Sequence, residues 1–248
     1  MEIIKRYITK NPCYTSNTKK NKTGYMQHST GAPGAMAETW IARWNSPSVS
    51  VGVEFVIDDT GIYQLLPIGI RSWHGGGSSN NTHVGCEICE PYETRLLSVN
   101  WQPLSYGGKN NTEWAVKRLQ EELIQWGYDP NGVDGSFGPG CKAAVEKFQA
   151  DNGLNVDGSV GKATLAKLQT RQGSLLKYNP DEVQDYFEDV YRKAVYTCAY
   201  VIQKLNSEVN ENNVLSHAEG YKKGIASNHA DVGHWFPQHG KSMNDFRA

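Results

Sequence analysis

Residues 179–205 read NPDEVQDYFEDVYRKAVYTCAYVIQKL and predict the longest helix of the chain. Asn179 stands at the cap, Pro180 at the first helical position and Glu182 two residues later, the pattern of a capping box. Apolar side chains then recur at helical spacing along one face; they are Val183, Phe187, Val190, Ala194, Cys198, Val201 and Leu205. We expect this face to pack on a sheet built from residues 1–90. The first domain would then be discontinuous, with an insertion between its two parts.

Strands and helices alternate upstream of this helix. β-branched and aromatic residues predict short strands, with a hairpin turn at Asp58-Asp59-Thr60-Gly61; the strands are expected at 3–9, 24–30, 50–58, 62–66 and 84–90. Met36, Trp40 and Trp44 fall at helical spacing, which predicts a helix at 35–45 with an aromatic face in the core. We therefore expect an α/β fold with a mixed central β-sheet flanked by helices, and a small all-α three-helix domain inserted into it.

The insertion differs from the rest of the chain in composition and contains an internal repeat. Residues 105–111 are rich in Gly and Asn and predict a linker. Three apolar helix faces follow, and Val133-Asp134-Gly135-Ser136-Phe137-Gly138 recurs as Val156-Asp157-Gly158-Ser159-Val160-Gly161. Asp-Gly-Ser turns ahead of helices supply a positive-φ residue and a helix cap. We predict a three-helix module at 110–172, inserted into a first domain formed by residues 1–105 plus 173–248.

Composition excludes several classes of function. The 25 basic and 26 acidic residues leave no electrostatic signal for binding nucleic acid or an anionic membrane. No apolar run is long enough for membrane insertion. The first residues lack an apolar signal core, so we expect the protein to accumulate in the cytoplasm. Five scattered cysteines do not resemble a disulfide framework. The sequence leaves the oligomeric state undetermined.

Histidines crowd the C-terminal segment, where four of the seven lie from position 217 onward. Imidazole and carboxylate groups suit zinc and most other first-row metal ions. A catalytic zinc site needs three protein ligands, an open position and a carboxylate that is not a ligand. His217, His229 and His234 all remain candidate ligands in this segment, beside Asp231. The segment alone does not complete a catalytic site, so further groups must come from upstream.

Two upstream residues are candidates for the missing groups. His28 ends a predicted strand just before a Gly/Pro turn. Glu87 lies in the middle of an apolar strand, where a carboxylate costs desolvation free energy unless it is paired or placed in a cleft. Glu90 has the opposite strand parity from Glu87, so we expect its side chain to face solvent or the rim of the site.

These pieces occur in an order that resembles the zinc-dependent N-acetylmuramoyl-L-alanine amidases of the second amidase class. That fold is shared with phage endolysins and peptidoglycan-recognition proteins. The insertion separately resembles the three-helix peptidoglycan-binding module of cell-wall hydrolases. The segments that carry the amidase resemblance are 25–30, Val53 to Leu66, Arg71-Ser72-Trp73-His74-Gly75-Gly76, Val84-Gly85-Cys86-Glu87, Ser216-His217-Ala218-Glu219 and His229-Ala230-Asp231-Val232.

The resemblance implies a catalytic zinc site. His28, His217 and Asp231 would bind Zn²⁺, and Glu87 would act as the general base and acid. His229 stands where the family usually has lysine and would steady the oxyanion of the reaction. A histidine makes this role depend on pH, because a neutral imidazole is a weaker oxyanion partner.

The resemblance also implies a substrate cleft, lined by His74 with Trp73 and Gly75. An exchange of His229 or His234 with His217 as metal ligand stays open at this point.

The implied reaction is hydrolysis of the amide that joins the lactyl group of N-acetylmuramic acid to L-alanine of the stem peptide. The substrate would be bacterial peptidoglycan, on which the module would hold the enzyme. A wall hydrolase without a signal segment resembles a phage or prophage endolysin that waits in the cytoplasm for a membrane pore. Two alternatives remain: a non-catalytic peptidoglycan-recognition protein, and a zinc peptidase that cuts inside the stem peptide.

Overall fold

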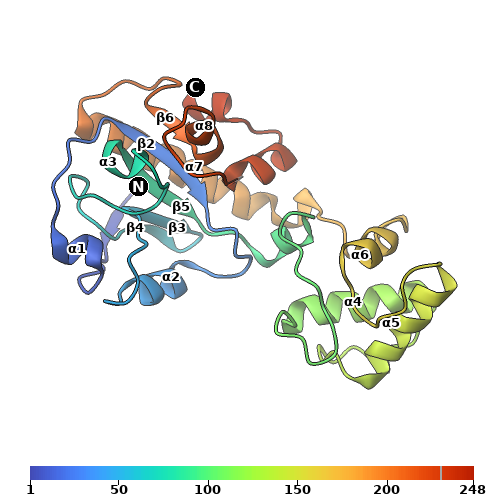
Figure 1. Cartoon of the computed structure of the whole chain (residues 1–248). Helices are drawn as coiled ribbons and strands as arrows, with labels where there is room; N and C mark the ends of the chain where they lie inside the picture. Colours follow the sequence, from blue (N-terminus) through green and yellow to red (C-terminus); the bar gives the residue numbers. More distant parts are fainter. Residues whose placement is uncertain (230) are drawn as a thin grey trace. The chain divides into compact units, whose positions relative to one another are not determined.

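The computed structural model describes residues 1–229 and 231–248, which fall into two units (Figure 1). The first unit joins Met1–Pro91 to Pro180–Ala248, and the second is Tyr92–Asn179. Among the helices of the described residues, none has the length and apolar character needed to cross a membrane.

A six-stranded mixed sheet organises the first unit. Its strands β3 and β4 form an antiparallel hairpin, and the other neighbouring pairs are parallel. A strand overlaps each predicted range, although each observed strand ends or begins at a different residue, and β6 was not predicted. In order across the sheet the strands are β1 (Ile3–Lys5), β4 (Gly61–Gln64), β3 (Phe55–Asp58), β5 (His83–Ile88), β2 (Gly24–Ser29) and β6 (Val214–Ser216).

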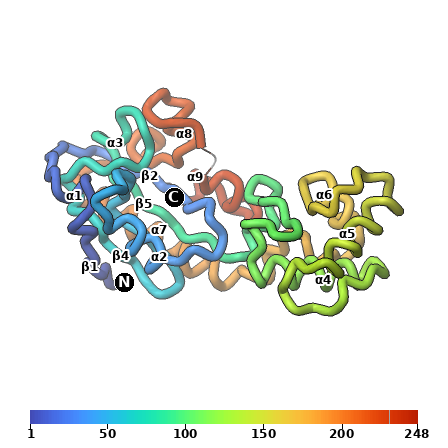
Figure 2. Tube along the Cα trace, turned by 60° about the horizontal axis from the view of Figure 1, so that its bottom comes forward, coloured from blue at the N-terminus to red at the C-terminus, as the bar shows by residue number. Residues whose placement is uncertain are grey.

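Helix α7 (Gln184–Leu205) packs against strands β2 to β5 on one face of the sheet. Its buried side chains include Phe187, Val190 and Ala194 from the predicted apolar face, so that packing is confirmed. The α-helix starts later than predicted, because a 3₁₀ turn, η2 (Pro180–Val183), precedes it. The long helix then returns the chain to the sheet, where β6 pairs with β2. Figures 1 and 2 show the C-terminal segment, in red, near β2.

Helix α2 (Ala37–Trp44) belongs to a second core, which includes Val56 and Tyr63 of the sheet. Trp44 of the predicted aromatic face is buried, as expected, whereas Trp40 is only partly buried. Short elements complete this unit; they are α1 (Pro12–Ser16), α3 (Ser79–Thr82), α8 (His217–Lys222), η3 (Asp231–His234), η4 (Phe236–His239) and α9 (Met243–Arg247).

The second unit contains helices α4 (Glu113–Gln125), α5 (Pro139–Asp151) and α6 (Lys162–Leu168). The repeated Asp-Gly-Ser turns have a shared physical basis. In the first turn the buried Gln120 side chain donates to Asp134 Oδ1 at 2.8 Å and accepts from the Gly135 amide at 2.9 Å. In the second turn Gln149 makes the same pair of contacts with Asp157 and Gly158. A glutamine from the preceding helix therefore fixes each turn.

The structure divides the chain earlier than the linker predicted at 105–111. The segment that begins with the 3₁₀ turn η1 (Tyr92–Leu96) belongs to the second unit. Its apolar side chains Leu96, Trp101 and Leu104 are part of the helical core. This segment has no regular apolar spacing, so the sequence pattern gave no sign of its packing partner.

A buried ion pair lies beside the sheet in the first unit. Lys22 Nζ contacts the Glu54 carboxylate, and both side chains are fully buried. The other Glu54 oxygen accepts from the Gly85 amide at 2.8 Å, and Lys22 also donates to Ser72 Oγ at 2.9 Å. The pair therefore connects strand β5 to the chain just before His74.

We predict that Lys22→Met lowers the free energy of unfolding by about 3–5 kcal/mol, because it leaves the Glu54 charge buried without a counter-charge. Urea unfolding would measure the change. The matched control is Arg6→Met, which breaks the exposed Arg6–Glu38 pair of the same unit and should cost about 1 kcal/mol or less. Equal losses in the two variants would contradict the prediction.

Candidate metal centre and active site

Three parallel strands bring the site together. His28 of β2 lies opposite Glu87 of β5 in the register of the sheet. On the other side of β2, Gln27 pairs with Ser216 of β6, so His217 follows directly beyond the last paired position. Ser216 and Glu219 form a capping box that starts helix α8 at His217. Pairing of short strands thus places His217 beside His28, although 189 positions separate them in the sequence.

Asp231 reaches the two histidines from the 3₁₀ turn η3 (Asp231–His234). Its backbone has a φ of 44°, a left-handed conformation that aspartate tolerates better than most residues. The next residue, Val232, is buried, and His234 Nε2 lies 3.1 Å from Glu90 Oε1. Glu90 also accepts from the Gly31 amide at 3.1 Å. These contacts attach the turn to the sheet at the point where Asp231 contacts His28 and His217.

Three ligand-type atoms converge in this site. His28 Nδ1 lies 3.1 Å from His217 Nδ1 and 3.0 Å from Asp231 Oδ2. His217 Nδ1 lies 2.7 Å from the same Asp231 oxygen. Burial alone would raise the pKa of Asp231, but the charges and hydrogen bonds of the two histidines hold it well below its usual range. Two imidazoles and an ionised carboxylate with converging lone pairs fit a zinc ion.

Among the described residues, His217 is the C-terminal histidine that forms this cluster with His28 and Asp231. The other two candidate ligands of the C-terminal segment lie elsewhere. His234 pairs with Glu90, and His229 is exposed, with Nδ1 3.2 Å from Ser227 Oγ. The His229 ring still lies 4.8 Å from the His217 ring, at the edge of the site.

Glu87 lies beside the cluster and does not belong to it. Its Oε2 atom is buried and has no hydrogen-bond partner among the residues that the structure describes. Burial raises the pKa of the Glu87 carboxyl well above its usual range, and the negative charges of Asp231 and Glu90 raise it further. A buried oxygen without a partner, next to a potential metal site, suits a group that exchanges a proton.

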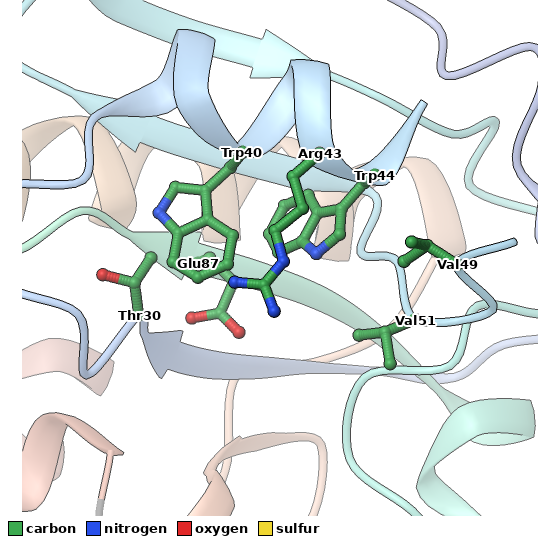
Figure 3. Close-up of a pocket in the computed structure, with 7 residues that line it drawn as sticks. All are labelled: Thr30, Trp40, Arg43, Trp44, Val49, Val51 and Glu87. Atoms are coloured by element: carbon green, nitrogen blue, oxygen red, sulfur yellow. The ribbon is translucent and has the colours of Figure 1, made fainter. Parts of the chain in front are cut away.

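A pocket of about 260 Å³ opens beside Glu87 (Figure 3). Helix α2 provides one wall with Trp40, Arg43 and Trp44, and the Arg43 guanidinium lies 5.4 Å from the centre of the Trp40 ring. The remaining lining residues are Thr30, Val49 and Val51. The helical spacing predicts Trp40 in the core and does not reveal this pocket, because spacing alone does not distinguish a core ring from one that lines a cavity.

The three residues predicted to line the substrate cleft lie in different surroundings. Trp73 is 44% exposed and Gly75 is buried. His74 does not point to the pocket of Glu87: its Nδ1 lies 2.8 Å from His28 Nε2 and its Nε2 lies 3.2 Å from the His83 carbonyl oxygen. Burial, followed by the charge of His28, holds the pKa of His74 well below its usual range. A substrate contact of these residues stays a prediction.

The expectation that Glu90 faces solvent or the rim is wrong, because its side chain is fully buried. The parity argument fails because strand β5 ends at Ile88, two residues earlier. Beyond that point side chains no longer alternate between the two faces of the sheet.

Two protein families match the chain. Residues 18–135 match the model described as N-acetylmuramoyl-L-alanine amidase, and residues 112–168 match the putative peptidoglycan binding domain. The first match includes His28 and Glu87 and ends before His217 and Asp231. The second match covers the three helices of the second unit.

Curated relatives include amidases of Bacillus subtilis (strain 168). The N-acetylmuramoyl-L-alanine amidase CwlH is 29% identical over 146 residues, which are 48% of this chain and 58% of that protein. The N-acetylmuramoyl-L-alanine amidase XlyA is 31% identical over 114 residues, which are 41% of this chain and 35% of that protein. The chain therefore spans less than two thirds of the length of either relative.

A solved structure of the Staphylococcus aureus hydrolase AmiA, in complex with its ligand, is similar with a TM-score of 0.56. The comparison covers 100% of this chain and 80% of that chain, at 12% sequence identity. At this identity the similarity concerns the fold alone. It confirms the predicted α/β class, a mixed sheet flanked by helices.

Proposed function

Because this chain belongs to the N-acetylmuramoyl-L-alanine amidase family, we propose that it hydrolyses the amide between the lactyl group of N-acetylmuramic acid and L-alanine in bacterial peptidoglycan. The chain also contains a putative peptidoglycan binding domain. We propose that this domain holds the enzyme on the wall polymer and raises the local concentration of scissile bonds.

One observation carries the proposal: a cluster of three metal-ligand atoms stands beside a buried carboxylate oxygen that has no described partner. A non-catalytic recognition protein needs neither feature, since binding a muropeptide requires no ionisable group held out of hydrogen bonds. The pocket beside Glu87 supports the same reading, because it gives a substrate access to that carboxylate.

We propose that the metal is zinc, held by His28, His217 and Asp231. Three protein ligands leave an open position, the arrangement typical of catalytic zinc sites. When bound there, zinc would supply Lewis acidity, which makes water more acidic and polarises a carbonyl group.

Glu87 is the residue that moves the proton. Its carboxylate accepts a proton from the attacking water and later gives it to the amine of the departing alanine. Its raised pKa serves both tasks, because a proton carrier works best when its pKa lies near the working pH. Oε2, which has no partner among the described residues, is the atom that can accept.

His229 is the proposed partner of the oxyanion that develops on the lactyl carbonyl. It is exposed and lies beside His217, so its ring can turn toward a bound substrate. A hydrogen bond aimed at developing charge lowers the barrier. In the pocket beside Glu87, the Arg43 guanidinium offers a positive charge to a carboxylate of the stem peptide.

Analysis of the bond ends released from purified peptidoglycan tests this function. We expect new amino termini on L-alanine, intact released stem peptides and no new reducing ends of sugars. New amino termini on other residues would favour the alternative of a zinc peptidase. Binding to peptidoglycan without release of any new end would favour the non-catalytic alternative.

A further inference from the structure

The far side of the His28 ring is fixed by a chain of two hydrogen bonds. His74 Nε2 lies 3.2 Å from the His83 carbonyl oxygen, and a carbonyl oxygen can only accept, so this nitrogen carries the proton. A neutral imidazole has one N–H group, which leaves His74 Nδ1 as an acceptor. The N–H at His28 Nε2 then donates to it across 2.8 Å. In the neutral ring that metal binding requires, His28 Nδ1 is therefore left with a bare lone pair toward His217 and Asp231.

The far side of the His217 ring is fixed in the same way. Ser227 Oγ donates its one hydrogen to the Gly75 carbonyl oxygen at 3.1 Å. The hydroxyl must then accept from its other neighbours, and His217 Nε2 lies 3.1 Å away. In its neutral form His217 therefore carries its proton on Nε2, and Nδ1 is again the bare nitrogen.

Both chains of hydrogen bonds involve the same short segment, since His74 and Gly75 are consecutive residues. Asn80 Oδ1 accepts from both of their amides at 3.0 Å. The segment fits closely: a Cβ on Gly85 would lie 2.6 Å from the His74 ring, and a Cβ on Gly75 would lie 2.4 Å from Ser79 Oγ. Gly85 thus leaves the space on strand β5 that the His74 ring occupies.

We propose that His74 and Ser227 are positioning residues that fix the tautomers of His28 and His217, so that both Nδ1 lone pairs point at one metal ion. This inference rests on the proposed zinc site and adds to it the residues that prepare the ligands before the metal binds. Partners behind metal-binding histidines are known to change metal affinity by about 10- to 100-fold.

The two positions differ in how easily water can take over. The contacts of His74 with His28 and His83 are partly buried. Gly85 of strand β5 leaves the space there for the His74 ring. Ser227 is exposed, so a water molecule can occupy the place of its hydroxyl and accept from His217. Loss of His74 should therefore weaken metal binding more than loss of Ser227.

The test compares His74→Asn with His74→Leu. The two new side chains have similar size, but only asparagine keeps a hydrogen-bond acceptor for His28 Nε2. Its Oδ1 atom is bonded to the γ carbon, as Nδ1 is in histidine, so it can take the same position. Zinc affinity is measured by competition with a chelator, and urea unfolding of the metal-free variants reports their stability. We expect His74→Leu to bind zinc about 10- to 100-fold more weakly than the unmodified protein, and His74→Asn to recover most of that loss.

Equal zinc affinities of the Leu and Asn variants would overturn the inference. They would show that position 74 only needs a side chain of this size and that its hydrogen-bond acceptor has no effect on zinc binding. If His74→Leu fails to fold, Ser227→Ala and Ser227→Thr make the same comparison. We expect Ser227→Ala to lose zinc affinity, by less than the loss expected for His74→Leu, and Ser227→Thr to keep it. Unmodified protein that binds zinc but leaves peptidoglycan uncut would overturn the proposed function and leave this inference standing.

Discussion

Glu87→Gln is expected to lower kcat/KM for peptidoglycan by about 10²–10⁴-fold, the contribution of a positioned proton carrier. Glutamine has nearly the same size as glutamate but cannot accept and return a proton. The three ligand atoms are unchanged, so zinc content should stay at the level of the unmodified protein. The rate of release of alanine amino termini and the zinc content of the same sample measure the two effects.

Glu38→Gln is the matched control, because it makes the same chemical change on the exposed surface of helix α2. Its activity should equal that of the unmodified protein. A Glu87→Gln variant that cuts peptidoglycan at the normal rate would remove Glu87 from the mechanism. Loss of zinc together with activity would instead assign Glu87 to metal binding.

His28→Ala is expected to abolish measurable activity and to weaken zinc binding by more than about 100-fold, the upper range for loss of a partner behind a ligand. The substitution removes one of three ligands and leaves only His217 and Asp231. Chelator competition and the activity assay measure the losses, and circular dichroism checks that the buried strand β2 still folds.

His239→Ala serves as the comparison for His28→Ala. The His239 ring is stacked on Phe187 at 3.8 Å and lies outside the ligand cluster, so this variant should keep its zinc affinity. Normal zinc binding by His28→Ala would contradict the assignment of His28 as a ligand.

Much of the fold could be predicted because its apolar patterns are regular. The face of helix α7 repeats over many turns, and β3 and β4 are joined at a recognisable turn. Strand β6 could not be predicted, because its three residues are too few to show alternation, and its pairing with β2 depends on contacts distant in sequence. The irregular segment after Tyr92 was misplaced for the same reason.

The chemistry of the site was more predictable than its geometry. Residue types and family resemblance together indicated His28, His217, Asp231 and Glu87 as the acting groups. Spacing alone could not choose among the C-terminal histidines, because the choice depends on the register between β2 and β6. The direction of the His74 ring could not be predicted from the sequence either, since it depends on the space that Gly85 leaves on strand β5.

The position of the metal is the central claim, and a crystal of the zinc-loaded protein tests it through the anomalous scattering of zinc. The account predicts one strong peak about 2.0–2.2 Å from His28 Nδ1, His217 Nδ1 and Asp231 Oδ2, with Glu87 nearby and not bound to the metal. A peak at the Nε2 atoms, a peak that includes His229 or His234 in place of His217, or a zinc ion held elsewhere in the chain would contradict it.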